Sequence, residues 1–248
     1  MTSYTIRPTV FVHVPKTAGS AVTSYLKQHC RSADEVAPNF FGDYSIYFRQ
    51  GPLSLIAGHF TFSRIRLLFP HSSFITFLRD PIARTISQFR SWKDPAKMTR
   101  EWMAAMGHEE KKLFEWIYSA SLEEFVRSDH PAIRKAVSNP MTKFLSSDGT
   151  ADVSSALTNL RKRFATFGIQ EEFDESIRLL QSACPWLGPY SLSPTAENHS
   201  RIAVDAITPA IRRRIASLNA ADIVLYDEAR ALFRDRVDAT PALVRSAA

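Results

Sequence analysis

The chain has 248 residues and a mass of 28.0 kDa, enough for one domain with a sizeable core. Hydrophobic residues make up 45% of the sequence and charged residues 23%, as in ordinary soluble globular proteins, and no run approaches the ~18 apolar residues of a membrane span. The net charge of +6 favours an anionic partner, without choosing among a nucleotide, an acidic glycan, nucleic acid and a membrane surface.

Cysteine usage and the N-terminal residues bear on where the protein resides. Cys30 and Cys184 are the two cysteines, too few and too far apart in sequence for a disulfide framework or a zinc site. We expect both to be reduced, buried thiols. The first residues lack the apolar core of a signal peptide, so we expect a cytoplasmic protein that does not bind a membrane.

The first predicted elements are a strand, a tight loop and a helix. Val10–Val14 is apolar and β-branched, which is typical of a strand buried on both faces of a parallel sheet, and Pro15 ends it. Apolar residues at helical spacing then predict a helix over Ser20–Gln28. Such a loop forms a phosphate cradle, because its backbone N–H groups and the positive end of the helix dipole point at one place. An irregular stretch rich in aromatic residues is expected to follow at Arg31–Gly51.

The loop itself carries further groups that bind anions. Lys16 adds a positive charge, and Thr17 and Ser20 add hydroxyl donors. The nucleotide pattern G-x-x-x-x-G-K-[ST] is not met, because the lysine precedes Gly19. The order of residues instead resembles the 5′-phosphosulfate loop of sulfotransferases that use 3′-phosphoadenosine-5′-phosphosulfate (PAPS), with Ala18 in place of a frequent glycine. An ordinary strand-to-helix turn is the alternative at this point.

The second predicted strand, Leu53–Ala57, leads to a histidine. Ligands of a parallel sheet bind beyond the carboxyl ends of its strands, so we expect His59 to lie level with the first loop. A neutral imidazole there can accept the proton of an attacking hydroxyl near neutral pH. The Gly-His-x-x-Phe arrangement, which begins at Gly58, resembles one in glycan sulfotransferases, several of which use a histidine as the base. A packing residue is the alternative for a lone histidine.

The third predicted strand, Ser73–Leu78, runs into a helix that Asp80 caps, with proline at its first position. The segment LRDPIARTIS at this junction resembles the family's 3′-phosphate motif. In that motif an arginine and a serine, here Arg79 and Ser87, hold the 3′-phosphate that distinguishes PAPS from ATP. Arginine suits the task because its planar fork binds two phosphate oxygens at once. The helical pattern places Arg84 and Ser87 off the buried stripe.

The middle of the chain is predicted to be mostly helical and charged from Trp92 to Arg127. Ser121 and Glu124 have the spacing of a capping box and should start a helix. In the resembled family the segment after the 3′-phosphate helix often shapes the acceptor pocket. The charge run alone is more simply a solvated helix face.

Further elements follow in the order helix, helix, strand, helix. A turn entering a helix is expected at Asn139–Leu145, a segment similar to one in carbohydrate sulfotransferases, with Lys143 as an acceptor contact. Apolar periodicity then predicts a helix at Asp152–Arg163, a strand at Phe164–Ile169 and a helix at Glu172–Cys184.

The last part of the chain offers two further site candidates. One interpretation of Glu171 and Glu172 is the acid and base of a glycosidase, but at the start of a helix they more simply complement its dipole. Arg201 matches an arginine that the family places near the 3′-phosphate and adenine of its nucleotide. Closing helices are expected over Ile207–Phe233, and the segment around Asp222 resembles the family's C-terminal signature.

The resemblance covers most of the chain and implies an α/β fold, a P-loop-type doubly wound parallel sheet flanked by helices. It implies a single domain over residues 1–248 with helical insertions at the acceptor site, a core over about residues 8–236 and a flexible tail at 237–248. The oligomeric state does not follow from the sequence.

The implied activity is transfer of the sulfuryl group from PAPS to an acceptor hydroxyl by in-line displacement, with 3′,5′-ADP (PAP) as the product. A hydroxyl of a sugar or glycan is the first candidate acceptor, and a lipid-linked or small-molecule alcohol is the second. The implied base is His59, and the implied charge-stabilising groups are Lys16 and the loop N–H groups. The cofactor contacts implied by the resemblance are Lys16, Thr17, Ala18, Gly19, Ser20, Arg79, Ser87 and Arg201. No metal is expected, since the leaving group is a stable phosphate. A nucleic-acid partner is not expected either.

Two other functions fit parts of the sequence. A P-loop kinase or NTPase would need a lysine within a glycine-rich loop and a strand-end aspartate for Mg²⁺, and the well-placed candidate, Asp80, is assigned to capping. A non-catalytic module that binds an acidic glycan or nucleic acid through its basic surface leaves the strand–loop–helix layout unexplained.

Overall fold

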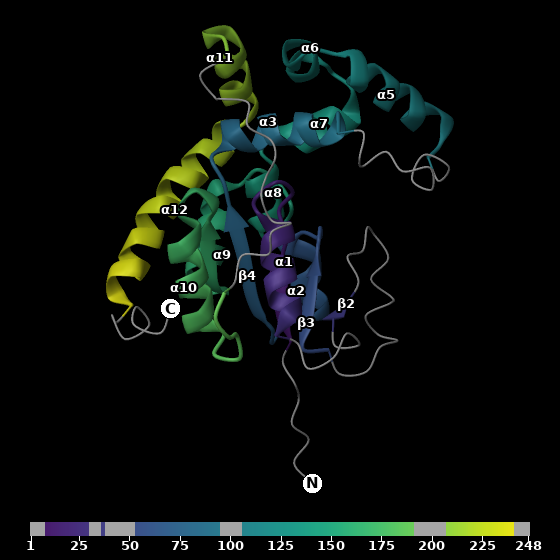
Figure 1. Cartoon of the computed structure of the whole chain (residues 1–248). Coiled ribbons are helices and arrows are strands. Elements are labelled where there is room, and N and C mark those ends of the chain that lie inside the picture. The colour runs from purple at the N-terminus through teal and green to yellow at the C-terminus, as the bar shows by residue number, and fades with distance from the viewer. Residues whose placement is uncertain (1–7, 30–35, 38–52, 95–105, 191–206, 241–248) are drawn as a thin grey trace.

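The computed structural model describes residues 8–29, 36–37, 53–94, 106–190 and 207–240 (Figure 1). Within these ranges, five parallel strands form one sheet in the order β2-β3-β1-β4-β5. They are β1 (Thr9–Val12), β2 (Val36–Ala37), β3 (Leu55–Gly58), β4 (Ser73–Leu78) and β5 (Phe164–Ile169). The chain extends the sheet on one side of β1 and then on the other, so the predicted doubly wound parallel sheet is confirmed.

Helices cover both faces of this sheet, as parallel strands require. One face is covered by α1 (Gly19–Gln28) and by α10 (Phe173–Ala183), which follows a short 3₁₀ turn at Gln170–Glu172. The other face is covered by α2 (Phe62–Leu68), α8 (Pro140–Leu145), α9 (Val153–Lys162) and α12 (Ala220–Ala239). Among the described helices, none combines the length and apolar character needed to span a bilayer.

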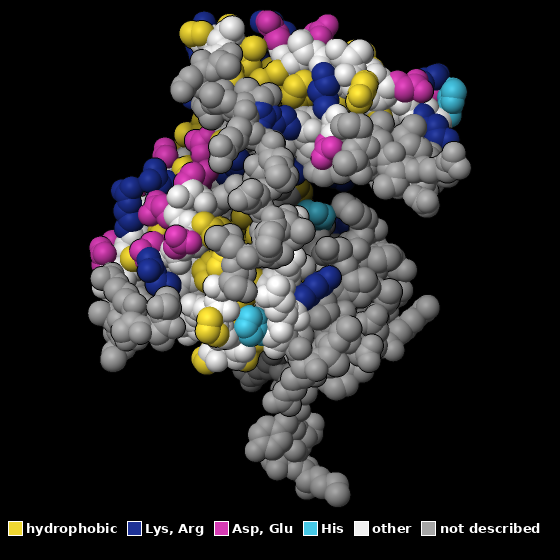
Figure 2. Space-filling view, viewed as in Figure 1, with side chains coloured by type: hydrophobic (Ala, Val, Ile, Leu, Met, Phe, Trp, Pro, Cys, Tyr) yellow, Lys and Arg dark blue, Asp and Glu magenta, His cyan; other side chains and the backbone are white. Residues whose placement is uncertain are grey.

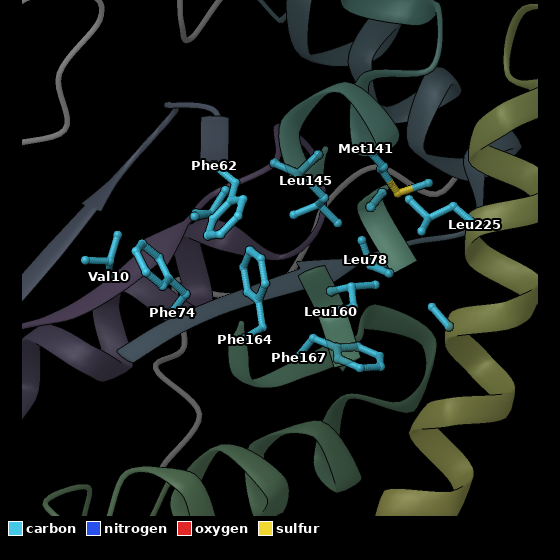
Figure 3. Packing of buried hydrophobic residues seen from close by; sticks show 14 of the residues in the cluster. Val10, Phe62, Phe74, Leu78, Met141, Leu145, Leu160, Phe164, Phe167 and Leu225 are labelled. Carbon is cyan, nitrogen blue, oxygen red and sulfur yellow. The ribbon is translucent and has the colours of Figure 1, made fainter. Parts of the chain in front are cut away.

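A core cluster fills the space between the sheet and α2, α8, α9 and α12 (Figure 3). Strand side chains alternate between the two faces, so Val10 points into this cluster while Phe11 packs against α1 on the other face. Three phenylalanines meet at its centre: the Phe62 ring lies 5.1 Å from that of Phe74 and 5.2 Å from that of Phe164, between ring centroids. These contacts fix β4 and β5 side by side.

A helical lobe lies beyond the carboxyl edge of the sheet and has an apolar cluster of its own (Figure 1). It consists of α3 (Pro81–Trp92), α5 (His108–Ser119), α6 (Leu122–Arg127), α7 (Pro131–Val137) and α11 (Pro209–Leu218). Phe89 of α3 packs on Phe125 of α6, with ring centroids 5.1 Å apart. Helix α3 begins at the end of β4, so it links the lobe directly to the sheet edge.

Two segments that resemble the family, around residues 139 and 222, cap each other's helices. The Asn139 Oδ1 atom accepts the backbone N–H groups of Ala221 (2.9 Å) and Asp222 (3.1 Å) in the first turn of α12. The Asp222 carboxylate in turn accepts those of Met141 (3.0 Å) and Thr142 (2.7 Å) in the first turn of α8, and the Thr142 hydroxyl as well (2.7 Å). The first N–H groups of a helix have no partner within the helix. Here each helix receives the acceptor for these groups from a residue about 80 positions away in sequence.

Most predicted elements are present, with shifts that strand pairing explains. The strands β4 and β5 have the predicted bounds, but β3 starts two residues later than expected because Leu55 pairs with Thr9 and Gly58 with Val12. Strand β2 lies within a stretch that was expected to be irregular, and its two residues pair in parallel with β3. Helices α2 and α7 were not predicted, and α12 continues through Ala239, into the expected tail.

The prediction that Arg84 and Ser87 lie off the buried stripe of α3 is wrong. Arg84 is fully buried and Ser87 is only 7% exposed. Helix α3 contacts α5, α6 and α7 as well as α11 and α12, so it is enclosed on more than one side and its polar residues are buried with its apolar ones.

Candidate active site

The loop between β1 and α1 has an unusual backbone conformation. Lys16 and Ala18 both lie in the left-handed region, with φ angles of 72° and 64°. Thr17 between them is fully buried, and its hydroxyl donates a hydrogen bond to the Val14 carbonyl (2.8 Å). Alternating backbone of this kind turns successive N–H groups toward one concave side, where an anion binds. The Thr17 hydroxyl therefore fastens the loop, rather than facing a ligand as the sequence indicated.

The left-handed conformation of Ala18 has a measurable cost in stability. A residue with a Cβ atom is strained there, whereas glycine is not, so Ala18→Gly should raise the free energy of unfolding by about 1 kcal/mol, or roughly 2–4 °C in Tm. Urea and thermal denaturation measure this change. The matched control is Ala216→Gly within α11, where the same substitution should destabilise by about 1 kcal/mol. A destabilised Ala18→Gly variant would contradict the strain.

His59 follows β3 at the carboxyl edge of the sheet. Its Nδ1 atom lies 2.9 Å from the His13 carbonyl oxygen, and because a carbonyl only accepts, Nδ1 carries the hydrogen. The lone pair of the neutral ring is therefore on Nε2. Burial lowers the pKa of His59 below 6.5, the Lys16 ammonium lowers it further, and the hydrogen bond to His13 opposes both. The imidazole is thus neutral at pH 7 and able to accept a proton.

Lys16 and two histidines share this part of the site. The Lys16 charge lowers the pKa of both His13 and His59, so the ammonium lies near both rings. The two imidazole centroids are 4.2 Å apart. In Figure 2 the molecule is hollowed between the helical lobe and the body of the sheet.

Arg79 brings a second positive charge to the loop from the end of β4. Its Nη1 donates to the Lys16 carbonyl at 3.3 Å. Its Nε is buried and has no hydrogen-bond partner within the described part of the chain. Burial lowers the pKa of Arg79, while Glu171, Asp80 and Tyr226 raise it. A buried donor left without an acceptor beside a cradle of N–H groups fits an anionic ligand with more than one phosphate.

The carboxylates near Arg79 hold the strand end in place. Asp80 Oδ1 accepts the N–H of Ala83 at 2.7 Å, so Asp80 caps α3 as predicted. Glu171 accepts the Asp80 N–H (3.1 Å) and the Tyr226 hydroxyl (2.8 Å), and the Glu171 charge together with burial raises the pKa of Tyr226. Glu172 pairs with an arginine of α12 (3.1 Å). Each glutamate thus has a structural partner, which agrees with the non-catalytic interpretation of this pair.

The remaining candidate site residues differ in their exposure and position. Ser20 is exposed at the start of α1, and Lys143 is half-buried in α8. Ser87 lies on the buried side of α3, and no hydrogen bond joins it to Arg79 in the described ranges. Arg201 lies outside the described residues. The structure therefore brings together the loop, His59 and Arg79, and leaves the other cofactor contacts as predictions.

Sequence reasoning missed one residue of this site, His13. It directly precedes the loop, but the alternation of a strand shows only which face a side chain takes, not what it meets there. In the fold its ring lies between the end of β3 and the start of α1. A histidine three residues before a phosphate-loop lysine was the available signal.

A parallel sheet with a loop of left-handed residues after β1 and a half-buried arginine after β4 defines a P-loop-like α/β protein. The model of the galactose-3-O-sulfotransferase family matches residues 7–246, nearly the whole chain. The chain belongs to the galactose-3-O-sulfotransferase family. The resemblance to PAPS-dependent sulfotransferases is thereby confirmed, and PAPS is the sulfuryl donor that goes with it.

Two solved structures show weaker similarity. One is a mouse sulfotransferase, SULT7A1, complexed with PAP, at 16% identity and a TM-score of 0.42, covering 85% of this chain and 62% of that one. The other is a sulfotransferase from Alicyclobacillus acidocaldarius, at 16% identity and a TM-score of 0.45, covering 92% and 99%. The chain thus spans less than two thirds of the mouse protein. No curated protein sequence matches it directly, so the family membership rests on the family model.

Proposed function

We propose that the chain transfers the sulfuryl group of PAPS to a hydroxyl of a sugar acceptor, with the 3-hydroxyl of galactose as the first candidate. The family name supports this acceptor. When bound, PAPS supplies the sulfuryl group and a phosphate leaving group. The observation that carries the proposal is the convergence of one neutral histidine, His59, with the cationic Lys16 and Arg79 at the carboxyl edge of the sheet. A hydroxyl acceptor needs a base, and a departing phosphate needs positive charge.

In this proposal His59 accepts the proton of the acceptor hydroxyl at Nε2. The bond from Nδ1–H to the His13 carbonyl holds the ring in the required tautomer and stabilises the imidazolium that forms. Lys16 and the loop N–H groups of residues 17–20 hold the 5′-phosphosulfate end of the donor. Preformed donors in a low-dielectric site are most effective there, because they stabilise the charge that develops during transfer. Arg79 holds the 3′-phosphate, with Ser87 and Arg201 as further contacts.

The helical lobe of α3, α5, α6, α7 and α11 is proposed to form the acceptor side of the site. It stands beyond the strand ends that carry His59 and Arg79, which is where ligands of open α/β sheets bind (Figure 1). Sheet and lobe act together as one catalytic domain in this proposal, over residues 8–236.

Calorimetric titration tests the donor site directly. The wild type should bind 3′,5′-ADP more tightly than 5′-AMP or ATP–Mg²⁺, and Arg79→Ala should weaken 3′,5′-ADP by about 100-fold, the worth of two charge-assisted hydrogen bonds. The matched control is Arg163→Ala, an exposed arginine just before β5, which should bind as the wild type does.

Other outcomes would overturn the proposal. A preference for ATP–Mg²⁺ would point to a kinase or NTPase instead. Binding of polyanions that survives the loss of Lys16 and Arg79, without nucleotide binding, would point to a non-catalytic module.

A further inference from the structure

The His13 side chain is enclosed on both faces of its ring. The His13 N–H donates to the Gly58 carbonyl (3.0 Å), which continues the β1–β3 pairing by one residue. The imidazole stacks on the Phe11 ring, with centroids 5.4 Å apart and planes within 7°, and lies 4.2 Å from the His59 ring. Only 8% of the residue is exposed. What remains open to a ligand is therefore an edge of the ring.

The Nε2 edge of the ring packs against the first residue of α1. A Cβ atom built on Gly19 would lie 1.7 Å from His13 Nε2, 1.9 Å from Cδ2 and 2.3 Å from Cε1. The Nε2 edge thus fills the space that a side chain at Gly19 would occupy, at the positive end of a ten-residue helix. Gly19 does not have a positive φ angle, so glycine is required here for the close approach of the imidazole.

The other ring nitrogen decides the tautomer of His13. Its Nδ1 is buried and has no hydrogen-bond partner among the residues described. Either tautomer leaves Nδ1 without a partner, but a buried lone pair without a donor is tolerated more often than a buried N–H without an acceptor, so we assign the hydrogen to Nε2. Burial lowers the pKa of His13 to about 3, with His59 and Lys16 contributing, so the ring is neutral. His13 is therefore a neutral N–H donor directed at the phosphate cradle.

We propose that His13 Nε2–H donates a hydrogen bond to an oxygen of the 5′-phosphosulfate group at the start of α1. The identity of the ligand rests on the proposed function; the donor and its direction rest on the geometry of β1 and α1. A neutral donor suits this position because another cation beside His59 would weaken it as a proton acceptor. His13 thus adds a contact to the anion without adding charge.

Ligand truncation separates this role from a structural one. His13→Leu should weaken binding of 3′,5′-ADP by about 10- to 50-fold, the worth of a hydrogen bond to a charged group. Adenosine 3′-monophosphate, which lacks the 5′-phosphate, should bind the variant and the wild type equally. His13→Gln, whose amide N–H reaches the place of Nε2, should keep most of the affinity for 3′,5′-ADP. Thermal melting of both variants checks that they fold.

Nitrogen-15 NMR of the wild-type histidines supplies a readout that needs no variant. The inference expects the Nε2–H tautomer of His13 and a shift of its Nε2–H signal on addition of 3′,5′-ADP. An Nδ1–H tautomer, or equal losses for the two nucleotides in His13→Leu, would overturn it. Wild-type binding that depends on Arg79 but not on His13 would overturn this inference alone, whereas no binding of 3′,5′-ADP by the wild type would overturn the proposed donor as well.

Discussion

Replacing His59 with alanine is expected to lower kcat by about 10³-fold, because a general base contributes roughly 10²–10⁴-fold to the rate. The affinity for 3′,5′-ADP should change by less than about threefold, because the base does not hold the nucleotide. The ring stands at the end of β3 with its Nδ1–H bonded to the His13 carbonyl, so alanine removes the proton acceptor without removing a loop residue. Transfer of labelled sulfuryl from PAPS to a galactoside measures kcat, and calorimetry measures the affinity. The control is His71→Ala, an exposed histidine before β4, which should keep full activity.

The pH profile tests the same role for His59 from another direction. The base must be unprotonated, so kcat/KM should fall as pH drops through the His59 pKa and stay level above it. Burial and the Lys16 charge lower that pKa, which puts the inflection below pH 6.5. The His59→Gln variant retains Lys16 but has no imidazole at this position. A low rate in this variant, without the fall of kcat/KM at low pH, supports His59 as the base. A His59→Ala rate above a tenth of wild type, or an inflection above pH 6.5, would contradict it.

The parts of the fold that sequence predicted are those with strong local signals. Strand β4 is a mostly apolar run followed by Asp80 and a proline, and its bounds match the prediction. The loop after β1 was located because Pro15 cannot donate to a ladder and Lys16 follows it, although β1 ends at Val12 and not at the predicted Val14. These features depend on residues that are neighbours in sequence, so they are readable without the fold.

Features that sequence did not reveal depend on approach between distant segments. Arg84 was expected off the buried stripe because helical periodicity predicts one buried stripe, whereas α3 is enclosed by helices from elsewhere in the chain. His13 was missed because its neighbours come from Gly19 and from the end of β3. The Thr17 hydroxyl was expected to face a ligand, but the left-handed turns on either side direct it to the Val14 carbonyl.

The second large effect is expected at Asp222, where alanine should lower the free energy of unfolding by about 3–5 kcal/mol. The carboxylate is fully buried and accepts three hydrogen bonds, two from Thr142 and one from the N–H of Met141. Alanine leaves these donors without an acceptor and opens the start of α8. Burial lowers the pKa of Arg84 to about 10, and the negative charge of Asp222 opposes this shift. Alanine removes that charge as well.

Urea denaturation compares this variant with Asp227→Ala, an exposed aspartate on the same helix, which should stay within about 0.5 kcal/mol of wild type. Asp222→Asn should be intermediate, because its amide oxygen still accepts while its NH₂ group faces donors. The substitution should also affect the active site. One turn further along α12, the Tyr226 hydroxyl donates to Glu171, and Glu171 also accepts the Asp80 N–H next to Arg79. Weaker binding of 3′,5′-ADP by folded Asp222→Asn would reveal that link. A loss in Asp222→Ala below about 1 kcal/mol would show instead that the reciprocal caps add little to stability.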